Sequence, residues 1–341
     1  MTETKIRNME EFAVVSGLSR PTMSKYFNDP NSVRASTRAR IEAALERYDY
    51  RPNIFAINQN RKMTKNVGIV VPFLADPFFA EIARALEERC LELGFRPSLF
   101  SSHGEQEHEL EILDNLRSLK PAGVLLAPLG RVSDKFKIAK FCDDVPTVLF
   151  DSFLPDIGLA FVGTSSPQMT QLIVDYLCRT GESPCFFEMK TPANPNADQR
   201  RQAYLEAVSA LGLSAHVIQV PGEGWAFEEI GRREGARALA NGSFKTNTVL
   251  CSNDRLAIGL LTACYEAGLD VGLKEGAQLR VAGQDDHPFS RYTCPPLTTV
   301  AQAYDAIARH SLDVLVAAVN GDRSVCETKL FEGRLVMRQS A

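Results

Sequence analysis

Several features that define common protein classes are missing from this sequence. No apolar run approaches the roughly 20 residues that a bilayer-spanning helix needs, and the start of the chain has no apolar core like that of a secretory signal. The eight cysteines are scattered and form no C-x-x-C pair, which argues against a structural zinc site and for reduced thiols. These absences predict a cytoplasmic protein without a membrane span or a metal centre.

Signature motifs of the main enzyme classes are also missing. The G-E-G segment at 222–224 lacks the third glycine and the strand-then-helix setting of a dinucleotide-binding fingerprint. The H-E pair at 108–109 does not continue as H-E-x-x-H, and no G-x-S-x-G or phosphate-binding loop occurs. The D-D-H segment at 285–287 carries metal-ligating residue types, but neighbouring side chains in a strand or loop point in different directions. We therefore expect no enzymatic activity and no cofactor.

Charge is distributed unevenly along the chain. The 341 residues carry a formal net charge of −4. Residues 1–65 hold 12 Lys and Arg against 7 Asp and Glu, whereas the remainder holds 26 basic and 35 acidic residues. This asymmetry predicts a small basic head that meets a polyanion and an acidic body that does not.

Residues 8–50 predict three short helices. Asn8 and Ser19 are suitable N-caps for the first and second helices, and Gly17 lies between them, where a sharp turn needs a positive φ. The third helix is expected from about Ser36. Two helices that are joined by a tight glycine turn and closed by a third form a helix-turn-helix.

From residue 67 onward, apolar runs alternate with amphipathic helical stretches, of which 77–93 is the clearest. Strands that alternate with helices predict parallel sheets covered on both faces. The remaining chain is too long for one such sheet, which favours two Rossmann-like lobes. The runs that we predict to be strands are 67–71, 124–127, 147–150, 186–189, 249–251 and 280–283.

A series of motifs occurs in the order found in the lactose/galactose repressor family. The segment S-G-L-S-R-P-T-M-S-K-Y-F-N at 16–28 resembles the family's A-G-V-S-x-x-T-V-S-R-x-L-N, and Y-R-P-N at 50–53 resembles Y-x-P-N. V-G-I-V-V-P with D-P-F-F over 67–79 is similar to the first strand of the family's sensor. Val33 with Thr37 and Arg38 matches the family's V-S-x-x-T-R. The remaining matches are S-N-D at 252–254, G-Q-D-D at 283–286, P-L-T-T-V at 296–300 and L-V-M-R-Q-S at 335–340.

The resemblance implies a small all-α helix-turn-helix head and an α/β periplasmic-binding-protein-like body of two Rossmann-like lobes. The expected divisions are 1–52 for the DNA-binding domain and 53–66 for a hinge helix and linker. Residues 67–163 plus about 297–324 are expected to form the first lobe, and 164–296 plus about 325–341 the second.

The second helix of the head is the expected recognition helix, whose first residues lie at base edges in the major groove. The resemblance places Arg20, Pro21 and Lys25 there. Arg20 and Lys25 can donate to guanine O6 and N7, while Pro21 offers only an apolar contact, for example to a thymine methyl. The alternative is that the two cations are solvated surface charges. The residues expected to bond phosphates are Ser19, Thr22 and Asn28.

The linker departs from the family pattern. In relatives the residue aligned with Asn53 begins a hinge helix that folds on DNA, and a leucine of that helix enters the minor groove. The aligned residue here is Gln59, whose side chain is expected to hydrogen-bond to groove edges rather than to unstack a base step. The operator is then bent less, or Ile57 or Phe55 enters the minor groove in place of that leucine.

The resemblance places an effector cleft between the lobes, at the carboxyl ends of the parallel strands. An Arg–Asp pair with amides and an aromatic platform suits a polyhydroxylated ligand. Asp76 stands where relatives have Asn, so the ligand is expected to present hydroxyls or a cation there. The alternative role of the aromatic members is core packing. The candidate effector-binding residues are Asp76, Phe78, Phe79, Ser101, Ser102, Asp151, Arg200, Trp225, Asn253, Asp254, Asp285 and Gln302.

Together these features predict a sequence-specific DNA-binding transcriptional regulator. The expected partners are a pseudo-palindromic double-stranded operator and a second copy of the chain. The leucine-heptad tail of tetrameric relatives does not follow Ala341, so we expect a homodimer. The effector is expected to be a sugar or polyol that controls repression of a carbohydrate operon by shifting the lobes at three crossing strands. A corepressor-type response to a nucleobase, a transport-type binding protein and an effector-free architectural protein are the alternatives.

Overall fold

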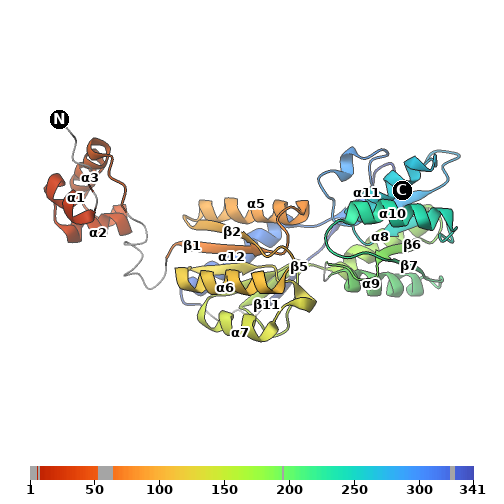
Figure 1. Cartoon of the computed structure of the whole chain (residues 1–341), viewed down its shortest axis with the longest axis horizontal. Coiled ribbons are helices and arrows are strands. Elements are labelled where there is room, and N and C mark those ends of the chain that lie inside the picture. Colours follow the sequence, from red (N-terminus) through yellow and green to blue (C-terminus); the bar gives the residue numbers. More distant parts are fainter. Residues whose placement is uncertain (1–5, 7, 53–63, 194–195, 323–326) are drawn as a thin grey trace. The chain divides into compact units, whose positions relative to one another are not determined.

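The structure is a computed structural model that describes residues 6, 8–52, 64–193, 196–322 and 327–341. The chain divides into two compact units, Met1–Thr64 and Lys65–Ala341. The first is the head and the second is the body (Figure 1).

Helical capping explains where the helices of the head begin. The side chain of Asn8 accepts hydrogen bonds from two backbone N–H groups in the first turn of α1, and Ser19 caps α2 in the same way. Gly17, between these helices, has a φ of 65°, a left-handed conformation that costs glycine little. All three features agree with the sequence prediction. The helices are α1 (Met9–Ser16), α2 (Arg20–Asn28) and α3 (Ala35–Tyr48), with a 3₁₀ turn at Pro30–Ser32.

A small apolar core holds the three helices together. The rings of Phe12 in α1 and Tyr50 stack with their centroids 4.4 Å apart. Met23 from α2 and Ile41 from α3 are fully buried beside them. This packing fixes the orientation of α2, and the first residues of that helix remain exposed.

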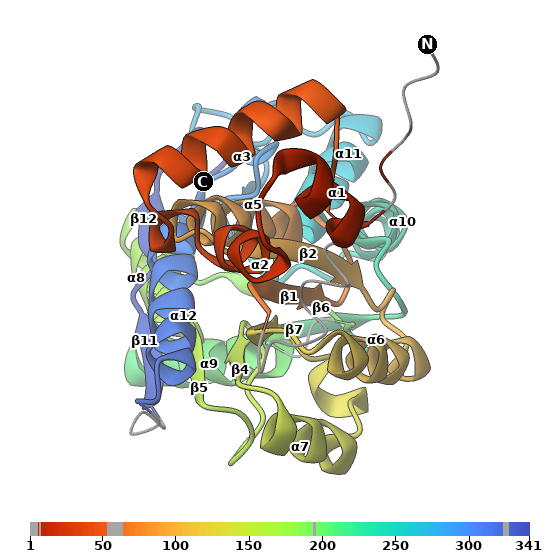
Figure 2. The same ribbon diagram turned by 90° about the vertical axis from the view of Figure 1, so that its left-hand side faces the viewer.

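The first lobe of the body is a six-stranded sheet in the order β11-β5-β4-β3-β1-β2, with all neighbours parallel. Helices α5 and α12 cover one face, and α6 and α7 cover the other (Figures 1 and 2). The strands are β1 (Asn66–Val71), β2 (Arg96–Ser101), β3 (Gly123–Leu126), β4 (Thr147–Phe150), β5 (Ala160–Thr164) and β11 (Glu327–Phe331). The helices are α5 (Pro77–Glu92), α6 (Gln106–Leu119), α7 (Lys135–Asp144) and α12 (Tyr304–Val319), with a 3₁₀ turn at Gly130–Val132.

The second lobe is a parallel sheet in the order β7-β6-β8-β9, with α8 and α9 on one face and α10 and α11 on the other. The strands are β6 (Cys185–Met189), β7 (His216–Val220), β8 (Thr248–Cys251) and β9 (Arg280–Ala282). The helices are α8 (Ser166–Thr180), α9 (Ala197–Ala210), α10 (Phe227–Ala240) and α11 (Asp254–Glu266), with a 3₁₀ turn at Ser290–Tyr292. An antiparallel pair, β10 (Thr299–Ala301) and β12 (Arg334–Val336), completes the body.

Two glycines bring α10 and α11 unusually close together. A Cβ atom on Gly231 of α10 would lie 2.3 Å from the carbonyl oxygen of Leu256, and one on Gly259 of α11 would lie 2.1 Å from the carbonyl oxygen of Glu228. Side chains at the starts of these helices can therefore meet directly, which matters for the site described below.

The lobe boundaries near the end of the chain differ from the prediction, which assigned 297–324 to the first lobe and 325–341 to the second. Residues 298–301 lie along the second lobe, since Gly283 donates to the carbonyl oxygen of Thr298. Strand β11 instead pairs along its length with β5 in the first lobe. Its mixed sequence, E-T-K-L-F, forms an edge strand and has no continuous apolar run that would have revealed it.

The chain crosses between the lobes three times, after β5, after β10 and between β11 and β12. The crossings are hydrogen-bonded to one another. The backbone N–H of Ser165 donates to the carbonyl oxygen of Phe331 at 2.9 Å. The side-chain amide of Gln168 accepts from Gly333 N at 2.8 Å and donates to its carbonyl oxygen at 3.3 Å. The hydroxyl of Thr164 donates to the side chain of Gln302, which follows β10, at 2.8 Å, so the three crossings form one connected hinge.

Candidate functional site

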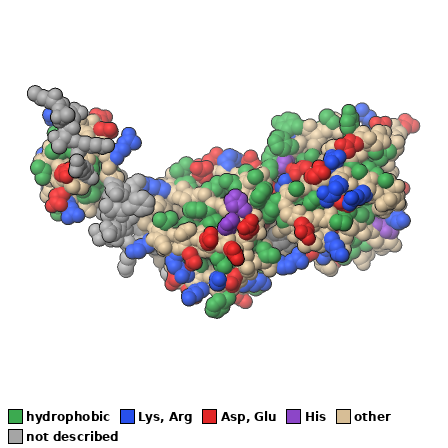
Figure 3. All heavy atoms as spheres, in the orientation of Figure 1, with side chains coloured by type: hydrophobic (Ala, Val, Ile, Leu, Met, Phe, Trp, Pro, Cys, Tyr) green, Lys and Arg blue, Asp and Glu red, His purple; other side chains and the backbone are tan. Residues whose placement is uncertain are grey.

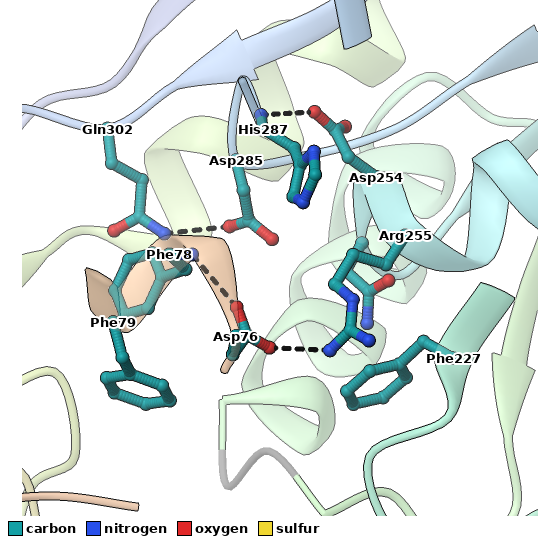
Figure 4. A pocket seen from close by; sticks show the side chains of 10 residues that line it. Asp76, Phe78, Phe79, Phe227, Asp254, Arg255, Asp285, His287 and Gln302 are labelled. Carbon is teal, nitrogen blue, oxygen red and sulfur yellow. Dashed lines mark hydrogen bonds and ion pairs between the residues drawn. The ribbon is translucent and has the colours of Figure 1, made fainter. Parts of the chain in front are cut away.

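A cavity lies between the two lobes, where helices α5, α10 and α11 begin and the chain leaves β9 and β10 (Figure 4). Both lobes contribute side chains to its wall, which combines carboxylates, cations, amides and aromatic rings. The residues that line it are Asp76, Phe78, Phe79, Phe227, Asn253, Asp254, Arg255, Asp285, His287 and Gln302.

Asp285 is held in place at the wall of the cavity by Arg200 and Gln302. The guanidinium of Arg200 bonds both carboxylate oxygens of Asp285, and Nη1 also donates to the carbonyl oxygen of Ser252 at 2.7 Å. Gln302 donates to the same carboxylate at 2.7 Å. Burial of Arg200 alone would lower the pKa of its guanidinium, but the Asp285 carboxylate keeps that pKa above its usual value. This bidentate pair presents Asp285 in one fixed orientation.

Gln302 also connects the cavity to the hinge. Its side-chain carbonyl oxygen accepts a hydrogen bond from the hydroxyl of Thr164, at the end of β5, at 2.8 Å. Tyr304, the first residue of α12, donates to the backbone carbonyl oxygen of Asp285 at 2.8 Å. A movement of Asp285 therefore acts directly on two first-lobe elements.

An ion bridge joins the lobes across the cavity. Arg255 of α11 donates to Asp76 at 2.8 Å and, with two nitrogens, to Glu228 at 2.7 Å each. The other oxygen of Asp76 caps α5 by accepting from Phe78 N at 2.9 Å. Burial raises the pKa of Asp76, and Arg255 acts against that rise. The guanidinium also lies over the ring of Phe227, 5.1 Å from its centroid, so both its edge and its face are occupied.

Asp254 and Asn253 line the cavity at the start of α11. Asp254 is fully buried and accepts from the hydroxyls of Ser290 and Thr299, both at 2.6 Å, and from the backbone N–H of His287. Burial raises its pKa to about 7. The side-chain oxygen of Asn253 caps α11 by accepting from the backbone N–H of Leu256. The NH₂ group of the same side chain is therefore the part suited to a ligand.

Five predicted residues do not line the cavity. Arg200 lies behind Asp285, as described above. Ser101 accepts from the backbone N–H of Leu74 at 3.3 Å and so shapes the loop after β1, while Ser102 is buried against the same loop. Asp151 is buried and bonded by Asn196 of the second lobe at 2.9 Å, and burial raises its pKa to about 7.

Trp225 is the fifth, and it packs between the lobes instead of facing the cavity. Its ring stacks on Phe73 of the first lobe with centroids 5.4 Å apart and an interplanar angle of 14°. It also meets the rings of Phe79 and Phe227, which do line the cavity, at 5.9 Å. The chain has no other tryptophan, so this residue is a natural reporter of lobe position.

The sequence analysis missed three residues of the cavity wall, namely Phe227, Arg255 and His287. Arg255 directly follows the S-N-D motif, so its place at the start of a helix after a strand could have suggested it. His287 was considered only as part of a metal-ligating trio. In the structure Asp285 bonds Arg200, Asp286 bonds Arg338, and the His287 ring faces the cavity (Figure 4).

In the head, Arg20, Pro21 and Lys25 of α2 are exposed. The hydroxyls of Ser19 and Thr22 hydrogen-bond to each other at 2.8 Å at the start of that helix. The predicted roles of Asn53 and Gln59 fall outside the described residues, and the Asn28 side chain is likewise not described.

Comparison with known proteins matches both units. Residues 8–53 match the family model described as bacterial regulatory proteins, lacI family, and residues 176–341 match a periplasmic binding protein-like domain. Over 313 residues the chain is 27% identical to the ribose operon repressor of Escherichia coli (strain K12), covering 90% of this chain and 92% of that relative. The chain therefore combines a lacI-family head with a periplasmic-binding-protein-like body.

Two solved structures have the same fold as this chain. The lac repressor dimer bound to operator and the anti-inducer ONPF matches with a TM-score of 0.84 and 24% identity, over 98% of this chain and 99% of that one. A LacI family transcriptional regulator from Lactobacillus casei with bound glucose matches with a TM-score of 0.66 and 23% identity, over 81% and 99% of the two chains.

The chain is a DNA-binding transcriptional repressor, and its relatives are regulators rather than enzymes. Within the described ranges, no helix has the length and apolar character needed to cross a membrane. On the face of the body seen in Figure 3, basic and acidic side chains are interspersed. That face offers no continuous basic field for DNA, which agrees with DNA recognition by the head.

Proposed function

We propose that this chain represses a carbohydrate- or polyol-utilisation operon, and that a sugar or sugar derivative bound between its lobes controls its affinity for the operator. The observation that carries this proposal is the Asp285 carboxylate, held by Arg200 and Gln302 beside Phe78 and Phe79. A fixed carboxylate accepts hydrogen bonds from vicinal hydroxyls, and aromatic rings pack on the C–H faces of a sugar. The ribose operon relative and the glucose-bound relative support this class of ligand.

The proposed DNA contact is the start of α2. Arg20 and Lys25 are exposed there and would donate to base edges, with Pro21 making an apolar contact. The protein would act in the cytoplasm as a homodimer, so that two heads meet the half-sites of a pseudo-palindrome. The operator-bound dimer of the lac repressor, which has the same fold, supports this arrangement.

The proposed control runs from the cavity to the hinge. A ligand that engages Asp285 acts on Gln302 and Tyr304, and through Gln302 on Thr164 at a lobe crossing. We infer that this shifts the angle between the lobes and thereby the linker at 53–66, which leads to the head. The effector changes DNA affinity only by its differential affinity for the two lobe arrangements.

A thermal-shift panel tests the ligand class. The full-length protein is heated with D-ribose, D-glucose, D-sorbitol, D-glucuronate and adenine, because a ligand that binds only the folded state raises the Tm. We expect at least one neutral sugar or polyol to raise the Tm and to change binding to an operator selected from random DNA. A response to adenine alone would replace this proposal by the corepressor hypothesis.

A further inference from the structure

His287 carries a hydrogen-bond donor for which the described part of the chain provides no acceptor. Its ring nitrogen Nδ1 accepts from the backbone N–H of Phe289 at 3.1 Å. An imidazole that accepts at Nδ1 carries its proton on Nε2, and burial lowers the pKa of His287, which favours this neutral form. The residue is only 4% exposed, and no acceptor among the described residues reaches Nε2.

The position of this donor points to a ligand. His287 lines the cavity between the lobes, and in Figure 4 its ring lies near Asp285, Asp254 and Arg255 and points into the cavity. A buried donor without a partner destabilises the folded chain, and native proteins leave very few such groups. The ring cannot turn freely towards another acceptor, because its Nδ1 bond and its backbone bond to Asp254 hold the segment.

We propose that His287 is an effector-binding residue whose Nε2–H donates to a hydroxyl or ring oxygen of the sugar, beside the Asp285 carboxylate that accepts the sugar's hydroxyl hydrogen. This rests on the proposed sugar-sensing function. A hydroxyl can accept from His287 and donate to Asp285 at the same time. An ammonium group can only donate, and a carboxylate group can only accept, so neither satisfies both side chains. The pair therefore selects uncharged hydroxyl groups.

The test compares three variants with the wild-type full-length chain. His287→Leu removes the donor, and His287→Gln keeps an N–H donor at similar reach. His310→Leu is the matched control. Nε2 of His310, on α12, also lacks a partner among the described residues, but the His310 ring faces Phe331 of β11 instead of the cavity. Binding of D-ribose, D-glucose and D-sorbitol is measured by calorimetry. For each compound that binds, we expect His287→Leu to weaken binding about three- to tenfold, His287→Gln to recover part of that loss, and His310→Leu to change nothing.

Deoxy sugars then identify the ligand atom. Removing the hydroxyl that faces His287 should weaken binding to the wild type but not to His287→Leu, because that variant has already lost the interaction. Equal affinities of the wild type and His287→Leu would overturn the role of His287 and leave the proposed function intact. If no sugar or polyol binds the wild type, both proposals are contradicted. An equal loss of affinity in His287→Leu and His310→Leu would show a general effect of the substitution, and it would also overturn the role of His287.

Discussion

Substitution of Asp76 by Asn should open the cleft of the ligand-free repressor. One oxygen of Asp76 caps α5 and the other accepts from Arg255 of the opposite lobe. In Asp76→Asn the amide oxygen can keep the cap. The NH₂ group then faces the guanidinium of Arg255, and because both groups can only donate, no hydrogen bond forms between them. The helix is therefore preserved, while this one bond between the lobes is lost.

The size of the effect follows from the chemistry of that bond. A hydrogen bond between charged groups contributes about 1.5–3 kcal/mol, and solvent screening is weak because the side chains of Asp76 and Arg255 are only 8% and 13% exposed. The equilibrium between closed and open lobes should therefore shift about 10- to 150-fold towards the open form.

Trp225 provides the assay, because it stacks on Phe73 across the lobe interface and is the chain's sole tryptophan. Acrylamide should quench the fluorescence of Asp76→Asn more strongly than that of the wild type, and small-angle scattering should give a larger radius of gyration. Asp134→Asn is the matched control, since Asp134 caps α7 in the same lobe and its ion-pair partner among the described residues is Lys137 of that helix. Identical quenching in wild type, control and Asp76→Asn would refute the reasoning.

Substitutions in the head and behind the cavity have different expected outcomes. Arg20→Ala and Lys25→Ala should each weaken operator binding by roughly 1–3 kcal/mol and relax base preference; titrations with single-base operator variants check this, and unchanged discrimination would remove α2 from base recognition. Arg200→Met should lower the free energy of unfolding by about 3–5 kcal/mol, because it leaves Asp285 without its buried cation; chemical denaturation measures the loss, and a near-zero value would contradict it. Burial raises the pKa of Asp254 to about 7, so the folded chain keeps a proton that the unfolded chain loses above about pH 4. The proton on Asp254 therefore stabilises the folded chain fully at low pH, and this stabilisation disappears as the pH rises towards 7. Asp254→Asn should flatten the pH dependence of the unfolding free energy by up to about 1.4 kcal/mol per pH unit. Parallel curves of unfolding free energy against pH for the wild type and the variant would argue against this.

Local sequence patterns predicted the parts of the fold that local chemistry determines. The caps at Asn8 and Ser19 and the left-handed Gly17 depend on near neighbours in the chain, and all three agree with the structure. The six apolar runs predicted as strands are all strands because each is buried on both faces.

Among the strands that no apolar run predicted, three have positions that explain why. Strands β2, β7 and β11 lie at the edges of their sheets, where exposed polar residues interrupt the apolar pattern. The same limit applies to the cavity. The family resemblance placed Asp76 at the cleft, but its partner Arg255 lies 179 residues further along the chain, and no local pattern connects the two.

The balance of charge in the cleft gives a separate reason to expect an uncharged effector. Asp76, Glu228 and Asp285 contribute three carboxylates, while Arg200 and Arg255 contribute two guanidiniums that are already bonded to them. A ligand carboxylate would find no cation free of a carboxylate partner in this group. At an effective dielectric constant of 20, a like charge 4 Å away costs about 4 kcal/mol, which exceeds the gain from one or two neutral hydrogen bonds. A neutral hydroxyl avoids this repulsion and can still donate to Asp285, so the charge balance and the geometry of His287 favour the same class of ligand for independent reasons.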